Sequence, residues 1–260
     1  MATLSVVIRN RNEGDHLTRL FARLREQHTQ PAEIIVVDND STDQSRELIH
    51  AYGAKLVHLP AGEFTYGRAT NLGLEHAQGD LVLLLSSHSL PVGSFFVDEV
   101  LAPFEDPRVA AVRIPIASNT TELKNLAHFP PLGPTSAPHE VYARGPVASG
   151  SVLRRSVWLD TKVDESLQAA EDKEWALRVL SQGKWIMPTV NACYVYTKVF
   201  SHHSYLAKIR REERAGFQTA GLRQHADTKI LLKSTVVAFR DALLKVHYHW
   251  SIFNLRRGLH

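Results

Sequence analysis

Apolar and polar residues alternate along the first 90 residues in blocks that predict strands and helices in turn. Short runs of branched apolar residues have the length of buried strands, and the segments between them place apolar residues three and four positions apart, as amphipathic helices do. The predicted strands cover 4–9, 33–38, 55–59 and 81–85, and the predicted helices cover 13–27, 41–52 and 66–77. Strands separated by helices of this length predict a doubly wound, mostly parallel α/β sheet flanked by helices.

The second half of the chain continues this pattern after a long interruption. A fifth strand is predicted at 109–114, and the proline-containing segment 115–145 is too long for an idle connection, so we interpret it as a mobile wall over a site. Order returns at 147–153, and a helix is expected near 170–182, stopped by Gly183. We predict one domain over 1–197 and a helical, basic C-terminal extension over 198–260.

Polar residues follow several of the predicted strands where each strand ends. Ligands of open α/β sheets bind just beyond these carboxyl ends. The polar ends are Asn10-Arg11-Asn12, Asp38-Asn39-Asp40 and Ser86-Ser87-His88. The last of them raises a question, because a buried strand here delivers two hydroxyls and an imidazole to its tip.

The composition is that of an ordinary globular chain. It has 260 residues, of which 44% are hydrophobic, and nowhere are there eighteen consecutive apolar residues. The start lacks a basic segment before its short apolar run, so no signal peptide is predicted. Cys193 is the only cysteine, which agrees with a reducing compartment. These features predict a cytoplasmic protein.

The net charge of +3 hides an asymmetry between the two predicted parts. Residues 198–260 carry 12 Lys and Arg against 4 Asp and Glu, about +8, which leaves about −5 for 1–197. The basic segment is either a solvated helical face or a surface for anionic lipid or an acidic substrate. Apolar positions in 236–253 suit a homodimer seam, a membrane-facing surface or an intramolecular clasp equally well. Nucleic-acid binding is not expected, because interleaved aromatics are missing from the basic region.

Carboxylates and one arginine are the candidate chemical groups, and the two commonest glycine-rich phosphate motifs are absent. Asp38 and Asp40 have the chemistry to accept hydrogen bonds from a nucleobase and a ribose, or else form a turn and a helix cap. Arg68 is either a diphosphate ligand or a surface ion pair. Glu171 and Asp172 open a helix, where they either complement its dipole or supply a general base.

Four stretches together resemble inverting family 2 glycosyltransferases with the GT-A fold. They are SVVIRNRNEGDHL, EIIVVDNDSTDQS, FTYGRATNLGLEHAQGDLVLLL and AAEDKEWALRVLSQG, in that order over 4–183. The sequences of the last two stretches are most similar to those of the rhamnosyltransferase-like branch. The resemblance implies transfer of a hexosyl group, with a lean toward L-rhamnose, from a nucleotide diphosphate sugar to a hydroxyl of a glycan or lipid-linked saccharide. An acceptor on a membrane lipid would explain the basic segment as a peripheral membrane contact.

The resemblance also implies roles for individual residues. Asp172 looks like the catalytic base, with Glu171 beside it, and deprotonates the acceptor hydroxyl. The expected donor-binding residues are Asn10, Asn12, Asp38, Asp40, Arg68, Asn71, Ser86, Ser87 and His88.

The chain departs from the family at Ser86-Ser87-His88, where most members carry an Asp-x-Asp or a single Asp that holds a metal. It resembles a subgroup with Ser-x-His in that place. Three interpretations of His88 stay open. It holds a softer metal such as Mn²⁺, Zn²⁺ or Fe²⁺, with Mn²⁺ favoured over Mg²⁺ and with His202 or His203 as a second ligand. Alternatively, it replaces the metal by hydrogen-bonding the diphosphate directly, or it is structural.

Two other function classes compete with an inverting hexosyltransferase. A non-catalytic nucleotide-sugar binder or partner subunit is suggested by the missing metal carboxylate, and it would bind without transfer. A sugar nucleotidyltransferase would need a glycine-rich basic loop after the first strand, where the chain has only Gly14.

Overall fold

The computed structural model describes residues 2–118, 123–124, 129–198, 207–208, 210–212 and 214–216. The chain divides into two compact units, Met1–Thr197 and Lys198–His260. In the second unit the described residues 207–208, 210–212 and 214–216 are helical, and Lys208 pairs with Glu212 one turn away at 2.5 Å. The elements below belong to the first unit.

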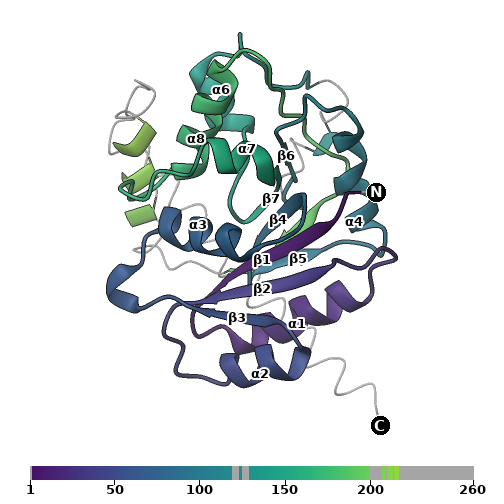
Figure 1. Cartoon of the computed structure of the whole chain (residues 1–260), viewed down its shortest axis with the longest axis vertical. Helices are drawn as coiled ribbons and strands as arrows, with labels where there is room; N and C mark the ends of the chain where they lie inside the picture. The colour runs from purple at the N-terminus through teal and green to yellow at the C-terminus, as the bar shows by residue number, and fades with distance from the viewer. Residues whose placement is uncertain are drawn as a thin grey trace. The chain divides into compact units, whose positions relative to one another are not determined.

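A six-stranded sheet forms the centre of the first unit (Figure 1), with strand order β3-β2-β1-β4-β7-β6. Its strands are β1 (Leu4–Asn10), β2 (Glu33–Asp38), β3 (Lys55–His58), β4 (Leu81–Ser86), β6 (Ala111–Arg113) and β7 (Gly150–Arg154). The first four are parallel, and β7 runs antiparallel to both β4 and β6. The predicted doubly wound, mostly parallel α/β fold is therefore confirmed.

Helices cover both faces of this sheet (Figure 1). They are α1 (Gly14–Arg25), α2 (Ser45–Tyr52), α3 (Tyr66–His76), α4 (Phe96–Leu101), α6 (Pro138–Arg144), α7 (Arg155–Asp160) and α8 (Glu171–Ser181). Alternate strand residues point to opposite faces, so Ile8 packs with apolar residues of α1 and α4 while Val7 packs with residues of α3, α7 and α8. Two apolar layers therefore hold the strand ends in fixed positions.

The segment predicted as a mobile wall, 115–145, contains packed structure where it is described. Leu132 and Val141 are buried, and Leu132 bridges to Met187. Helix α6 begins with Pro138, whose fixed φ suits the first helical position. The described part of this segment is therefore packed against the rest of the first unit, in contrast to the mobile segment that was predicted.

Two further features differ from the sequence expectation. Helix α2 begins at Ser45 rather than at residue 41, because the preceding polar side chains bond across to another loop, as described below. The chain also forms a second, two-stranded sheet after β4, in which β5 (Ser89–Pro91) pairs antiparallel with β8 (Tyr194–Tyr196). Short 3₁₀ turns, η1 (Ala61–Glu63) and η2 (Ala102–Glu105), complete the first unit.

The strand register brings the polar ends of the sheet together. Asn10 lies opposite Asp38, and Arg9 lies opposite Ser86. The three predicted polar ends therefore meet at one edge of the sheet. Within the described residues, every helix is too short or too polar to cross a bilayer.

Candidate active site

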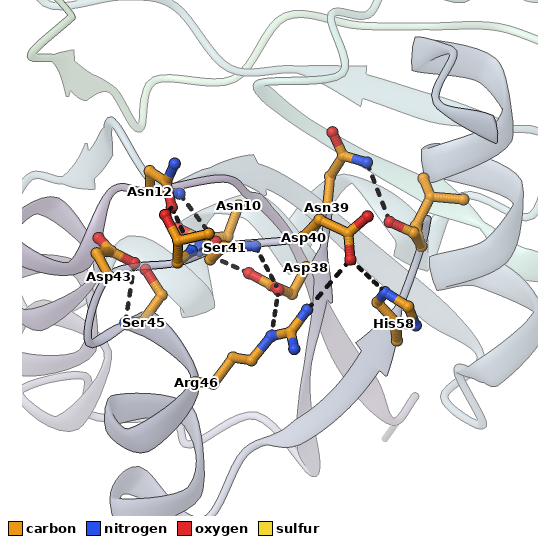
Figure 2. A network of polar contacts seen from close by, with 12 residues as sticks. Asn10, Asn12, Asp38, Asn39, Asp40, Ser41, Asp43, Ser45, Arg46 and His58 are labelled. Atoms are coloured by element: carbon orange, nitrogen blue, oxygen red, sulfur yellow. Dashed lines mark hydrogen bonds and ion pairs between the residues drawn. The ribbon is translucent and has the colours of Figure 1, made fainter. Parts of the chain in front are cut away.

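Asp38, the last residue of β2, lies at the centre of a buried polar network (Figure 2). Its carboxylate accepts hydrogen bonds from Asn10 Nδ2 at 3.2 Å, the Ser41 amide at 3.1 Å and Arg46 Nε at 2.9 Å. The residue has no exposed surface. Burial raises the pKa of Asp38, but the bonds from Ser41, Arg46 and Asn10 outweigh it and hold the pKa below its ordinary value.

Asp40 lies two residues later with its side chain partly exposed, in the left-handed region at φ 51°. Its carboxylate contacts His58 Nε2 at 2.7 Å (Figure 2). It also accepts from the Ala61 amide at 2.7 Å. The bonds from His58 and Ala61 lower the pKa of Asp40. Asp40 thus presents a fixed, partly exposed carboxylate at this edge of the sheet, whereas the Asp38 carboxylate is buried and holds the loop in place.

The β2–α2 loop is tied to the β1–α1 loop by side chains that the sequence suggests as helix caps. Ser41 Oγ accepts from the Asn12 amide at 2.8 Å, and Asp43 accepts from the Gly14 amide at 3.0 Å. In return, Asn12 Oδ1 accepts from the Thr42 amide at 2.7 Å. These reciprocal bonds delay the start of α2 and fix both loops at the edge of the sheet.

Helix α3 carries the two other residues predicted to approach the donor. The Arg68 guanidinium is partly exposed and lies 3.7 Å from Glu165, a loose ion pair that leaves it available at the rim. Asn71 is buried, and its amide group donates to Val163 O and Glu165 and accepts from Trp158 Nε1 and the Val163 amide.

Those four bonds fill the hydrogen-bonding capacity of the Asn71 side chain and favour a positioning role, while its contact with the donor stays a prediction. Gly67 allows the 163–165 segment to pack closely against α3, because a Cβ at this position would lie 2.5 Å from Asp164 O. Together the two residues fasten the 163–165 segment to α3.

The start of α8 places two carboxylates at the same edge of the sheet. Asp172 Oδ2 accepts from the Ala148 amide at 3.0 Å, and Glu171 is almost fully buried with its carboxylate 3.9 Å from Arg9 Nη1. Ala170, immediately before them, has φ 60°, a left-handed conformation that costs a residue with a Cβ about 1 kcal/mol or more. Among the described residues, every non-glycine with positive φ lies at this edge.

Arg9, at the end of β1, connects the sheet to that helix start. Its Nη2 donates to Ala148 O at 3.2 Å, and its guanidinium lies 5.3 Å from the centroid of the Tyr66 ring. The Ala148 peptide is thereby held between Arg9 and Asp172. Lys173 holds the same segment from α8 by donating to Pro146 O at 2.8 Å.

A pocket beside Asp172 extends between β4, α3 and α8. Most of its lining is apolar, and it comprises Thr70, Leu84, Pro146, Val147, Ala148, Ser151, Leu153, Val163, Glu171, Asp172 and Trp175. Glu171 and Asp172 are the two carboxylates that line this small cavity.

The Ser86-Ser87-His88 tip is built into the second sheet. Ser86 and Ser89 hydroxyls lie 3.1 Å apart, and the His88 carbonyl accepts from the Thr197 amide and hydroxyl at 3.0 and 3.1 Å. His88 is buried, with Nε2 3.0 Å from the Glu13 carboxylate. His16 stacks edge-on against it, with ring centroids 4.5 Å apart. His202, the partner predicted for His88, lies outside the described residues.

Sequence reasoning missed four side chains that this edge uses. Glu13 precedes α1 and His16 lies in its first turn, whereas Arg46 pairs with Asp38 and His58 pairs with Asp40. Glu13 and His16 stood three positions apart beside a polar strand end, which was a usable signal. The distant partners Arg46 and His58 had none, because their pairing depends on the folded loops.

Comparison with known proteins agrees with this geometry. Residues 5–153 match the family model described as Glycosyl transferase family 2. The O-antigen chain rhamnosyltransferase WbaN of Salmonella anatum is 27% identical over 114 residues, which cover 43% of this chain and 36% of that protein.

Solved structures share the fold at low sequence identity. The mannosyltransferase PcManGT of Pyrobaculum calidifontis, in complex with GDP-Man and Mn²⁺, has a TM-score of 0.67 at 17% identity, covering 99% of this chain and 82% of that one. S. aureus TarS 1–349 in complex with UDP has a TM-score of 0.61 at 18% identity, covering 90% and 70%. The fold is that of GT-A glycosyltransferases, and with its family match over more than half of its length the chain belongs to glycosyl transferase family 2.

Proposed function

We propose that this protein transfers a hexosyl group from a nucleotide diphosphate sugar to a hydroxyl of a glycan or lipid-linked saccharide, with inversion at the anomeric carbon. The observation that carries the proposal is the position of Asp172, a partly exposed carboxylate held by the Ala148 amide on the edge where the polar strand ends meet. The relative WbaN, by its name, acts on O-antigen chains with rhamnose, which supports a rhamnosyl donor and a glycan acceptor here.

Asp172 acts as the general base in this proposal. The acceptor oxygen forms a bond to the anomeric carbon as its proton passes to Asp172, and the bond from that carbon to the diphosphate breaks, leaving its electron pair on the diphosphate oxygen. The Ala148 amide orients one carboxylate oxygen. Glu171 is buried against Arg9 and positions the helix start rather than meeting the acceptor.

The donor side is assigned to the β1 and β2 ends. Asp40 and the Asn12 loop offer acceptors at the rim, and Arg68 offers a cation for the diphosphate. Asn10 and Asp38 support them from below. A divalent cation, Mn²⁺ before Mg²⁺, would supply positive charge where the leaving diphosphate gains negative charge, and His88 stands at the strand end where the family holds its metal.

The decisive experiment compares Asp172→Asn with the native chain in transfer and nucleotide-binding assays. We expect a loss of transfer of at least a thousandfold with nucleotide affinity changed less than threefold, because only the proton acceptor is lost. Glu174→Gln is the matched control, since Glu174 lies on the same helix turn but pairs with Arg178. Retained transfer in Asp172→Asn would overturn the base assignment.

A non-catalytic nucleotide-sugar binder is the second candidate, because the tip Ser86-Ser87-His88 lacks the usual carboxylate. The same assays separate the two functions. Binding of a nucleotide sugar without transfer to any glycan acceptor would favour the binder. Membrane contact through 198–260 and a dimer seam in 236–253 stay predictions, since those residues lie largely outside the described part.

A further inference from the structure

Three side chains of metal-ligand type meet at the start of α1 and the tip of β4. Glu13 Oε1 lies 3.0 Å from His88 Nε2, and Glu13 Oε2 lies 3.1 Å from His16 Nδ1. One ligand atom from each residue lies within 4.8 Å of the other two. We infer that Glu13, His16 and His88 form a divalent-cation site of two imidazole nitrogens and one carboxylate.

The spacing of these atoms suits coordination. Metal–ligand distances of about 2.0–2.2 Å place neighbouring ligand atoms about 3.0–3.5 Å apart. Each imidazole nitrogen already lies in this range from one Glu13 oxygen, His88 Nε2 from Oε1 and His16 Nδ1 from Oε2. All three ligand atoms lie within 4.8 Å of one another, so binding an ion needs only a small approach, and His16 is the partly exposed member on the first turn of α1.

The backbone holds His88 in place for this role. Thr197 anchors the carbonyl of His88 through two hydrogen bonds, and the His88 ring is flanked by His16 at 4.5 Å and Tyr196 at 5.9 Å between centroids. Burial of the ring limits its rotamers. A fixed imidazole lowers the entropic cost of binding an ion, as supporting contacts do in other metal sites.

The ligand set selects the kind of ion. Two neutral imidazoles and a carboxylate suit Mn²⁺, Fe²⁺, Co²⁺ and Zn²⁺, whereas Mg²⁺ and Ca²⁺ prefer oxygen ligands. His88 stands where most of the family has a carboxylate. Glu13, which follows β1, supplies the anionic ligand that the tip of β4 lacks. The purpose of the ion rests on the proposed function, since it would lie where a donor diphosphate is expected.

Metal binding can be measured without donor or acceptor. The native chain, stripped with EDTA and dialysed, is titrated with Mn²⁺ while free Mn²⁺ is followed by its electron paramagnetic resonance signal, and then with Co²⁺ followed by visible absorption. We expect one ion per chain for each, and Mg²⁺ at tenfold excess should not displace Mn²⁺.

Single variants test the ligand set. Glu13→Gln, His16→Gln and His88→Gln should each weaken Mn²⁺ binding by about tenfold or more. His28→Gln is the matched control, because His28 is exposed on another surface and pairs with Asp98. His16→Gln is the decisive variant, since its ring is partly exposed and its loss threatens folding least, and circular dichroism verifies the fold of each variant.

The outcomes separate this site from the proposed function. No bound Mn²⁺ or Co²⁺ in the folded native chain, or equal binding in native and His16→Gln chains, would overturn the metal site and leave Glu13 as a hydrogen-bonded bridge between two imidazoles. Asp172→Asn should keep full Mn²⁺ binding. Metal binding without any sugar transfer would instead count against the proposed function alone.

Discussion

The Arg9 guanidinium lies 3.9 Å from the Glu171 carboxylate and also donates to Ala148 O. Both side chains are mostly buried, so their charges are screened by water far less than those of a surface pair. The backbone N–H of Ala148 in turn donates to Asp172 Oδ2. One cation at the end of β1 therefore positions both carboxylates at the start of α8.

Arg9→Met should destabilise the fold and slow transfer together. Removing the cation takes away the positive charge that lies 3.9 Å from the buried Glu171 carboxylate, which costs about 2–4 kcal/mol of unfolding free energy. Transfer should fall in kcat more than in donor KM, because the Ala148 peptide no longer aligns Asp172. Urea unfolding and steady-state kinetics measure the two effects.

A double-mutant cycle supplies the control for that prediction. Glu171→Gln combined with Arg9→Met should recover about 1–2 kcal/mol relative to the sum of the single changes. Arg178→Met, which breaks a more exposed pair with Glu174, should cost less than about 1 kcal/mol. Additive effects of Arg9 and Glu171 would refute their coupling.

The carboxylate network of β2 should make stability depend on acid. Asp38 and Asp40 have pKa values below the ordinary 3.8 because hydrogen bonds favour their charged forms in the fold. The unfolded chain therefore binds protons more readily, so stability is constant above about pH 5 and falls as the pH drops below 3.8. Urea unfolding between pH 2.5 and pH 7 measures this slope.

Asp38→Asn should flatten that acid slope while lowering stability at pH 7, since Arg46 then loses its buried partner. Asp160→Asn, a change at an exposed position, serves as control and should keep the native slope. Equal slopes in the native and Asp38→Asn chains would show that other groups set the acid dependence.

Ala170→Gly should stabilise the protein. Glycine relieves the left-handed strain at φ 60°, a gain of about 1–2 kcal/mol, and loses about 0.4–1 kcal/mol through the greater freedom of the unfolded chain. The net gain is about 0.5–1 kcal/mol, measured as a higher Tm and urea midpoint. Ala176→Gly, inside α8, should instead destabilise by about 1 kcal/mol. A loss of stability in Ala170→Gly would show that the strain is absent.

The regular part of the fold followed from local periodicity. The first four strands and the helices α1, α3 and α8 lie within a few residues of their predicted positions. Each has one buried face, so its apolar residues recur with the period of a strand or a helix, and this pattern can be recognised within the segment alone. The sequence also predicted the edge at which the polar residues meet, because the carboxyl ends of parallel strands lie on the same side of a sheet.

The partners at that edge did not follow from local pattern. Ser41 and Asp43 have the composition of a helix cap, yet they bond to residues about 30 positions away, and Asn71 serves the segment at 163–165. A short polar side chain satisfies whichever backbone group the fold brings near. The local sequence therefore shows which groups such a side chain can donate or accept, but it does not identify its hydrogen-bond partner.

The two hydrogen bonds from Thr197 to the His88 carbonyl have a structural consequence. Thr197 ends the first compact unit, and the chain continues at Lys198 into the second. The position of His88 therefore depends on a residue 109 positions further along the chain, at the end of the first unit, and not on β4 alone.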